Sequence, residues 1–583
     1  MGQRTFESCK PFYVVPARPE DRNSCCCRTH VEIRMLFSAC MNYRKQLIKE
    51  QPEREQVAPI YTHLTDLVDK TLCPKMEGNE FHSKTCCDRE CVNCGVSLLT
   101  FLPEEESTDE DGTQVKWQRF EYVTVGENRR LQMVEKQTPP GDMLSYFKSL
   151  LVKFPGHRLR ANWQNNQLKG LIKCLPVGHV CCVHDYSENY TCQHQDQIQS
   201  LYFGQTQASI HVTVLHRHSL AEIDGEDSSA DKPNVVTEHL FVISPDLKHD
   251  HHSVHHCRSL VAQYLAEIKY PVAFMHEWTD GCSAQYKSRH CMGDVSYSVA
   301  DFGYPTIRNY FETSHAKGPQ DGAGANLKFK ADMAVIRRQK VIQNARDLFE
   351  FAQENLRVPS EKASLSRRIF FYVEQHDRNR PRRYFKEVKG NRAVHSILAR
   401  EQSGYLELRE LSCYCDHCIA NDFASCDNAP FVKNWQEHVL EQQVPERRAT
   451  RNDITEIREG LLDLVSKNSI VVIASADVGE DYYLLKVISD QPEILTTSAS
   501  DDWNARYPAG AKIIRGNFYE RVDCSQSSSN HFFKLIPDKT AYVYSSTVRF
   551  ICSDLQELTE NGVKLFMVSE AEHLDILDSL DGF

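Results

Sequence analysis

Three aspartates stand where open α/β sheets place their functional side chains. Asp185 closes an expected strand, Asp280 closes another strand 95 residues later, and Asp321 opens an expected helix 41 residues after that. Strand carboxyl ends meet at one edge of such a sheet. A single aspartate there is ordinarily an exposed cap, but three converging carboxylates are the ligands that two hard divalent cations require. The spacing therefore predicts a site for Mg²⁺ or Mn²⁺.

The third acid of this set has a rival. Glu312 lies on the short expected strand just before the helix near Asp321, so either carboxylate can complete the set. Four further polar side chains share these loops and are expected to support the acids or contact a phosphate group: Gln285, Lys287, His315 and Lys317. The plain alternative for each is a solvated loop residue.

A first cysteine cluster occupies residues 73–94. Cys91-x2-Cys94 has the spacing with which paired thiolates wrap one side of a tetrahedral zinc ion. Six Cys and His candidates within 22 residues argue against chance. The expected ligands are Cys73, Cys86, Cys91 and Cys94, with His82 and Cys87 as open alternatives.

A second cluster reads Cys413-x-Cys415-x2-Cys418-x7-Cys426, with His417 as a spare ligand. Its four sulfurs predict a second structural zinc site, although the gap between Cys413 and Cys415 is short for a knuckle. Cysteines that are simply buried in a core are the alternative.

Length and composition limit the classes of protein to which the chain can belong. The chain has 583 residues, 41% of them hydrophobic and 25% charged, which fits several globular domains. No apolar run approaches the ~18 residues of a membrane span, and residues 1–6 lack the apolar stretch that is typical of a secretory leader. We therefore expect no membrane partner and a reducing compartment, where the 23 cysteines bind metal or are buried rather than forming disulfides.

The net charge of −12 conceals a basic stretch. Residues 328–392 hold 17 Lys/Arg against 8 Asp/Glu, whereas six of the eight residues 104–111 are acidic and predict a loop or linker. Basic side chains neutralise phosphates, so we expect the stretch to bind DNA through Arg380, Arg382 and Arg383.

Hydrophobic periodicity indicates the elements that must position the acids. Buried strands are expected at 177–185, 207–215, 239–244, 272–280 and 308–313, with helices at 254–268, 322–338 and 343–355. This order is that of an α/β layer. Two helices broken at Pro155-Gly156 precede it, helices at 31–49 and 60–68 come first, and five short strands after residue 469 predict a small β-barrel.

The order of these elements, with acids on the first strand, the fourth strand and a late helix, is similar to the RNase H-like core of DDE/DDD transposases and retroviral integrases. Four strings resemble a group of transposon-derived animal proteins: DYSENY (185–190), QSLYF (199–203), WTDGCSAQYK (278–287) and NYFETSHAKGPQDG (309–322). The likeness covers roughly residues 70–430 and includes the Cys86-x4-Cys91-x2-Cys94 pattern. It implies catalytic roles for Asp185 and Asp280, with Asp321 or Glu312 as third acid.

The expected fold class is a multidomain α+β protein with an RNase H-like α/β core, N-terminal helical and zinc-binding segments and a C-terminal small β-barrel. The expected division is a helical region (1–70), a zinc module (71–100), an acidic linker with helices (101–175) and the RNase H-like core (176–357). A basic region with the second cysteine cluster (358–445), the barrel (465–560) and an acidic tail (561–583) follow.

The resemblance implies a nuclear DNA transposase, or a domesticated descendant of one, that acts as an endonuclease and strand transferase. It also implies two Mg²⁺ or Mn²⁺ ions at the acids and structural Zn²⁺ at the cysteines. The alternative is a non-catalytic DNA- or chromatin-binding protein derived from a transposase, and a generic RNase H-like nuclease is the third reading. DNA is the expected partner. Chromatin or protein tails bound by the barrel, and a homo-oligomer, are left open.

Overall fold

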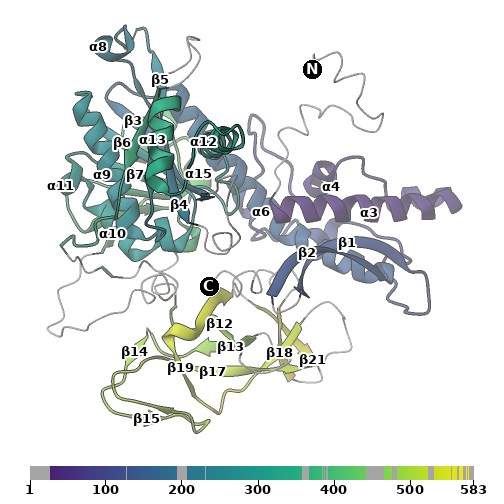
Figure 1. Ribbon diagram of the computed structural model, residues 1–583. Coiled ribbons are helices and arrows are strands. Elements are labelled where there is room, and N and C mark those ends of the chain that lie inside the picture. The colour runs from purple at the N-terminus through teal and green to yellow at the C-terminus, as the bar shows by residue number, and fades with distance from the viewer. Residues whose placement is uncertain are drawn as a thin grey trace. The chain divides into compact units, whose positions relative to one another are not determined.

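The computed structural model describes residues 27–440 apart from 126–127, 193–205, 230, 358–366, 382, 384, 387 and 389–390. It also describes residues 462–576 apart from 463–464, 476–481, 491, 523–530, 553–554, 561–562, 569–572 and 574–575. Two compact units are present, Met1–Thr71 with Val96–Phe154 and Leu72–Gly95 with Pro155–Phe583 (Figure 1). Within the described ranges, no helix combines the length and the apolar character that crossing a membrane requires.

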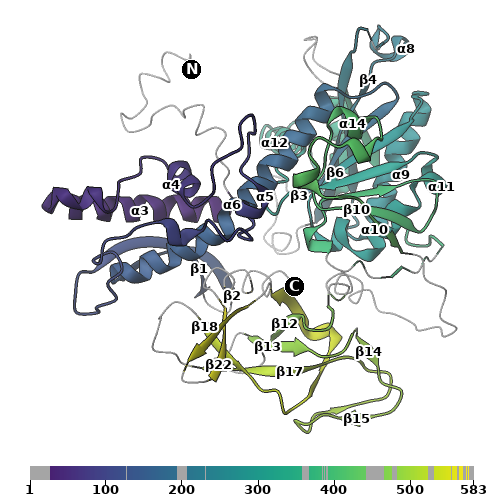
Figure 2. The same ribbon diagram turned by 180° about the vertical axis from the view of Figure 1, so that it is seen from behind.

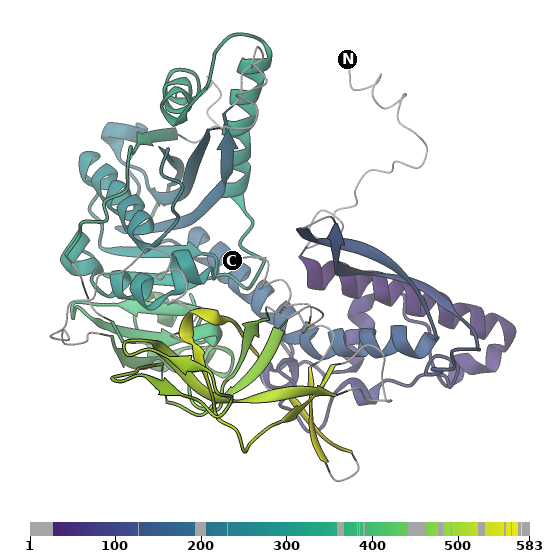
Figure 3. The same ribbon diagram turned by 60° about the horizontal axis from the view of Figure 1, so that its bottom comes forward.

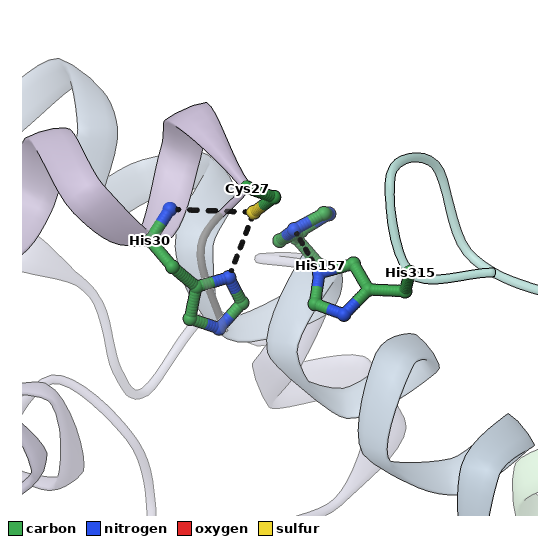
Figure 4. Close-up of side chains that lie close together, drawn as sticks. All are labelled: Cys27, His30, His157 and His315. Carbon is green, nitrogen blue, oxygen red and sulfur yellow. Dashed lines mark hydrogen bonds between the residues drawn. The ribbon is translucent and has the colours of Figure 1, made fainter. Parts of the chain in front are cut away.

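The first unit packs a long helix against a β-hairpin. Cys27 caps helix α3 by accepting a hydrogen bond from the backbone N–H of His30 (Figure 4). Buried Arg44 on α3 donates two hydrogen bonds to Glu105, at 2.9 and 3.0 Å, and so fixes part of the acidic stretch expected to be a linker. The helices and strands are α3 (Arg28–Glu50), η1 (Pro52–Gln56), α4 (Leu64–Lys70), η2 (Val96–Leu98), β1 (Val115–Val125) and β2 (Asn128–Thr138).

Helix α6 (Pro140–Lys173) corrects one sequence expectation. Two helices broken at Pro155-Gly156 were predicted, but a single helix of 34 residues continues through Pro155. A larger residue at position 156 would be too close to its neighbours, because a Cβ atom there would lie 3.0 Å from the carboxylate of Asp88 and 3.2 Å from the carbonyl oxygen of Cys87. The glycine therefore lets the segment after α5 (Lys84–Cys87) approach the helix backbone.

A nine-stranded mixed sheet forms the centre of the second unit, in the order β11-β10-β9-β7-β6-β3-β4-β5-β8. β3 is parallel to β6, and β6 to β7, whereas β4 is antiparallel to both β3 and β5. The strands are β3 (His179–Thr191), β4 (Gln207–His218), β5 (Val235–Ser244), β6 (Phe274–Thr279), β7 (Thr306–Tyr310), β8 (Arg367–Tyr372), β9 (Ser396–Ala399), β10 (Tyr405–Arg409) and β11 (Gln436–Val439). All five expected core strands are present, four of them within four residues of their predicted bounds, whereas β3 continues six residues beyond its predicted end.

Helices cover both faces of this sheet. α9 (His251–Glu267) packs Val261 and Leu265 against Cys182 and Leu215 on one face. On the opposite face α12 (Pro319–Ile336) packs Leu327 against Val212. Smaller elements complete the layers: α8 (Ala221–Asp224), the π-helix η3 (Ser283–Lys287), α10 (Arg289–Ser296), α11 (Ser298–Phe302), α13 (Ala345–Leu356), η4 (Asn391–Ala393), α14 (Asp416–Ile419), η5 (Phe423–Ser425) and α15 (Ala429–Val432).

The C-terminal region is a separate curled antiparallel sheet (Figure 3), in the order β20-β12-β13-β17-β18-β22-β21. Its core gathers Val471, Leu485 and Ile514. The five strands expected from the sequence are present, whereas the short strands β14 to β16 and the strands β20 to β22 were not predicted. The elements are β12 (Ile470–Ala474), β13 (Tyr482–Val487), β14 (Glu493–Ile494), β15 (Ala499–Ser500), β16 (Arg506–Tyr507), β17 (Lys512–Val522), β18 (His531–Leu535), β19 (Ala541–Tyr544), η6 (Ser545–Thr547), β20 (Val548–Cys552), β21 (Gln556–Glu560) and β22 (Val563–Val568).

Candidate functional site

Asp185 and Asp280 occupy equivalent positions on adjacent parallel strands. β3 and β6 pair with Val183 opposite Trp278, and each aspartate lies two residues further along its strand direction. Neighbouring strands are about 4.8 Å apart, so the two backbones are close at this point. Side chains alternate between faces, which puts both carboxylates on the face that α12 covers.

The strand end predicted at Asp185 is wrong, because β3 continues to Thr191. What ends near Asp185 is the pairing with β6, which stops at Val183. A register irregularity between Ser187 and Tyr190 then interrupts the pairing with β4. Asp185 therefore lies where β3 loses its parallel neighbour, and Asp280 directly follows the last residue of that neighbour.

The pair is electrostatically costly without a counter-ion. Burial, followed by the charges of Asp280 and Asp321, raises the pKa of Asp185 to about 7. Burial also raises the pKa of Asp280, against the opposing influence of a hydrogen bond from the Cys282 N–H and of the Lys287 charge. Asp185 and Asp280 are half-buried, and raised carboxylate pKa values of this kind are typical of sites that bind a cation or a proton.

Asp321 lies in the first turn of α12, the helix that covers this face. α12 comes close to β3 because Gly324 has no side chain, and a Cβ there would lie 2.7 Å from the Ser187 hydroxyl oxygen. Asp321 itself is exposed, and its Oδ2 accepts a hydrogen bond of 2.8 Å from the Gly318 N–H. Its carboxylate thus caps its own helix while it raises the pKa of Asp185.

Glu312, the rival third acid, is surrounded by cationic and imidazole groups. Its Oε2 accepts hydrogen bonds from Arg160 at 2.8 Å and from His395 at 3.3 Å, and its Oε1 lies 3.2 Å from His157 Nδ1. Burial opposes ionisation, but the hydrogen bonds from His157 and His395 and the Arg160 charge hold the pKa of Glu312 well below its usual range. These partners make Glu312 a structural anion.

The residues predicted to support the acids separate into two groups. Lys287 is buried, with its Nζ 4.9 Å from the ring centroid of Tyr310, and its charge lowers the pKa of Asp280. Gln285 is half-buried on the same π-helix and Lys317 is exposed. His315 lies 3.0 Å from His157, nitrogen to nitrogen (Figure 4), and burial with the His157 charge lowers its pKa to about 4. It is neutral at pH 7, so it adds no positive charge for a phosphate.

Sequence reasoning missed one residue beside the acids. Tyr286 is fully buried, and within the described residues its hydroxyl has no hydrogen-bond partner. Burial raises the pKa of this phenol, and the charges of Asp185 and Asp280 raise it further. It lies on the π-helix η3 that follows Asp280. Its neighbours in the sequence gave no signal of this buried position.

The first cysteine cluster comes together as the sequence predicts. Cys73, Cys86, Cys91 and Cys94 have sulfurs within 4.8 Å of one another. The Sγ atoms of Cys73 and Cys91 are 3.8 Å apart, and a tetrahedral ion with Zn–S bonds of about 2.3 Å requires about 3.8 Å. The alternative ligand His82 instead places its Nδ1 2.8 Å from the Cys73 carbonyl oxygen. Cys87 is buried and lies outside the four-sulfur group.

The second cluster also has four converging sulfurs, from Cys413, Cys415, Cys418 and Cys426. Cys415 precedes α14 and Cys418 lies within it; Figure 2 labels this helix. Arg409 on β10 donates to the sulfurs of Cys418 at 3.5 Å and Cys426 at 3.2 Å. N–H donors of this kind stabilise thiolates around a metal, so these residues fit zinc better than plain burial. His417 is not a member of the group.

The arginines expected to bind DNA form ion pairs. Arg380 donates to both oxygens of Asp294, at 3.0 and 2.9 Å, and Arg383 donates to both oxygens of Asp301, at 2.8 and 2.6 Å. Arg382 lies outside the described residues. Elsewhere in the basic stretch Lys330 on α12 and Arg337 at its C-terminal end are exposed. The DNA-binding role of Arg380 and Arg383 stays a prediction, and their structural role is to fasten the chain after β8 to α10 and α11.

A family model described as a domain of unknown function (DUF8701) matches residues 164–412. The matched range begins within α6, ends just after β10 and contains Asp185, Asp280 and Asp321. The first cysteine cluster, the second cluster and the C-terminal sheet lie outside it. The comparison with curated proteins finds no match, and neither does the comparison with solved structures.

Proposed function

We propose that residues 176–357 form an RNase H-like core, and that the chain is a DNA transposase-type endonuclease and strand transferase or a domesticated descendant of one. The observation that carries this proposal is the position of Asp185 and Asp280 at equivalent points of parallel strands. The first and fourth strands of the proposed core are neighbours, although 95 residues separate the two acids. The raised pKa of Asp185, about 7, supports a site that needs a cation.

The oxygen ligands of this site suit Mg²⁺ or Mn²⁺. A divalent ion there would supply positive charge to a phosphate and activate a hydroxyl or water nucleophile. Asp185 and Asp280 would hold it from the two strands, and Asp321 would contribute from α12. Burial raises the pKa of Asp280, and the Lys287 charge opposes this rise and so favours the carboxylate form that binds a metal. Glu312 is a poor candidate because Arg160 and His395 already occupy its Oε2 atom.

The two cysteine clusters support the same proposal as folded modules that position nucleic acid. The zinc ions would be structural, since each has four sulfur ligands and no open position. Lys330 and Arg337 are exposed on the same helix, α12, whose first turn holds Asp321. Their positive charges would neutralise phosphates of a DNA strand that runs along α12 toward the aspartates.

One observation favours the alternative, a DNA- or chromatin-binding protein without catalysis. Among the described residues, the three aspartates do not form a group within the 4.8 Å that the cysteine clusters achieve. Asp321 is also engaged in capping α12. A transposase-derived protein that no longer cuts DNA would keep the sheet and the zinc modules, and Asp321 would serve only to cap α12.

Cleavage of DNA separates the two functions. The zinc-loaded full chain is incubated with a randomised duplex library and Mg²⁺ or Mn²⁺, and new ends are mapped by sequencing. We expect metal-dependent ends that Asp185→Asn and Asp280→Asn both abolish, while Glu188→Gln, an exposed acid of the same strand, retains them. Binding of the library without metal-dependent ends would instead establish the non-catalytic alternative.

A further inference from the structure

The C-terminal region carries a group of three packed rings, here named the aromatic corner: exposed Trp503 and half-buried Tyr483 and Phe518. Trp503 lies between β15 and β16 and is 41% exposed. Its ring is 5.8 Å from that of Phe518 at an interplanar angle of 86°. Tyr483 on β13 is 6.1 Å from Phe518 at 69°. Both pairs have the edge-to-face geometry that aromatic rings prefer, and Trp503 is the exposed ring of the three.

A cation already lies over one of these rings. The Nζ atom of Lys539 is 4.9 Å from the centroid of the Trp503 ring, within the ~6 Å range of a cation–π interaction. Lys539 is exposed, and among the described residues no carboxylate forms an ion pair with it. The aromatic face is therefore the partner that holds this ammonium group.

The turns that carry the ring and the cation are fixed to each other. Asp501 accepts hydrogen bonds from the backbone N–H groups of Trp503 at 3.0 Å and Tyr542 at 3.0 Å. Asp502 accepts one from Thr540 at 2.8 Å. These bonds tie the loop before β16 to the loop before β19. The Trp503 face is thus held in place before any ligand arrives, which reduces the entropic cost of binding.

We propose that the aromatic corner binds the methylated ammonium group of a lysine side chain presented by another protein. Methylation removes N–H groups and their hydration but keeps the positive charge, so a methylated ammonium leaves water for an aromatic face more readily than a primary one does. The contact of Lys539 shows that a lysine side chain can place its ammonium group over the Trp503 ring. Lys539 therefore competes with an incoming lysine for this ring. This inference is independent of the nuclease proposal.

The test uses the zinc-loaded full chain and calorimetric titration with a short Gly/Ser peptide that carries one central trimethyl-lysine, and with the same peptide carrying unmodified lysine. We expect the trimethylated peptide to bind at least ~10-fold more tightly, because its ammonium group has no N–H groups and therefore loses less hydration on the aromatic face than the unmodified ammonium does. Trp503→Ala should lose that preference and Trp503→Phe should retain part of it. Lys539→Ala should tighten binding about threefold by removing the competitor.

A control and a second ligand make the outcome decisive. Tyr544 is also 41% exposed in this sheet but packs against Tyr507, so Tyr544→Ala should bind the peptide as the wild type does. Equal binding of both peptides, or unchanged binding by Trp503→Ala, would overturn the proposal. Phosphocholine carries the same trimethylammonium group without a lysine stem. Binding of phosphocholine as tight as that of the peptide would contradict a protein lysine as the source.

Discussion

Asp185 and Asp280 face the same side of the central sheet from neighbouring parallel strands, two residues beyond the paired residues Val183 and Trp278. The preceding residues on this face, Val183 and Trp278, are apolar and buried. The two carboxylates therefore lie together at the edge of an apolar surface. Folding therefore brings together two carboxylates that repel each other, and a site with this property is commonly functional rather than stabilising.

Replacing Asp185 should stabilise the metal-free protein at neutral pH. The folded protein keeps the Asp185 proton up to about pH 7, whereas the unfolded chain releases it near 3.8. Stability therefore falls as the pH rises between these values and stays low above pH 7. We expect Asp185→Asn to raise the free energy of unfolding at pH 8 by at most ~4 kcal/mol, and to have no effect near pH 3.

Denaturant unfolding at pH 3, 5, 7 and 8 measures this difference. The matched control is Glu188→Gln, three residues further along β3, where the side chain is exposed. A constant difference between the wild type and Asp185→Asn at all four pH values would show that burial of the Asp185 charge has been overstated.

Each chain should hold two zinc ions. Cys91→Ser and Cys418→Ser should each reduce the zinc content of the purified chain from two to one, because structural zinc requires all four ligands. Cys87→Ser and Cys174→Ser replace cysteines outside both groups and should retain two. Elemental analysis of the five proteins provides the measurement, and one zinc or none in the wild type contradicts the assignment.

Glu312 and Asp321 should respond differently to removal of their charge. Glu312→Gln removes the anion that Arg160 and two histidines share, although Arg160 keeps its ion pair with Asp88, so we expect it to lower the free energy of unfolding by about 3 kcal/mol. Asp321→Asn removes an exposed cap and should cost less than ~1 kcal/mol, while it abolishes cleavage. A stable Glu312→Gln variant without cleavage would make Glu312 the third catalytic acid instead.

The basic stretch should divide into structural and DNA-binding charges. Arg380→Gln leaves buried Asp294 without its guanidinium partner and should lower stability by about 3 kcal/mol. Lys330→Gln with Arg337→Gln should leave stability unchanged and should flatten the slope of log K against log salt by about 0.9 for each phosphate that is no longer neutralised. DNA titrations over a range of salt concentrations, together with thermal melts, distinguish the two effects. An unchanged salt slope in the double variant would show that α12 does not bind the DNA backbone.

Local patterns predicted the elements that are present. The apolar runs around Val183, Val212 and Trp278 indicated buried strands, and the structure has β3, β4 and β6 there. Cysteine spacing predicted both four-sulfur groups, because ligands for one ion are close in the chain. The hairpin β1–β2 was missed because charged residues such as Arg119, Glu121 and Arg129 interrupt its alternation.

Long-range partners could not be predicted. Glu312 meets His157 and Arg160 from more than 150 residues away, and the chain carries no local pattern that pairs them. The same holds for Arg409 beside the second cysteine cluster and for Asp294 beside Arg380. Pro155 predicted a helix break, but packing along the whole of α6 maintains the helix through it.

Titration of Mn²⁺ into the zinc-loaded full chain, followed by electron paramagnetic resonance of the free ion, shows whether the two strand-borne aspartates bind a divalent cation. If Asp185 and Asp280 form such a site, the wild type takes up Mn²⁺ at pH 7.5 and the Asp185→Asn, Asp280→Asn double variant does not. The Glu188→Gln variant, which changes an exposed acid of β3, serves as a control and should bind as the wild type does. Equal Mn²⁺ uptake by the wild type and the double variant would contradict a cation site at these carboxylates.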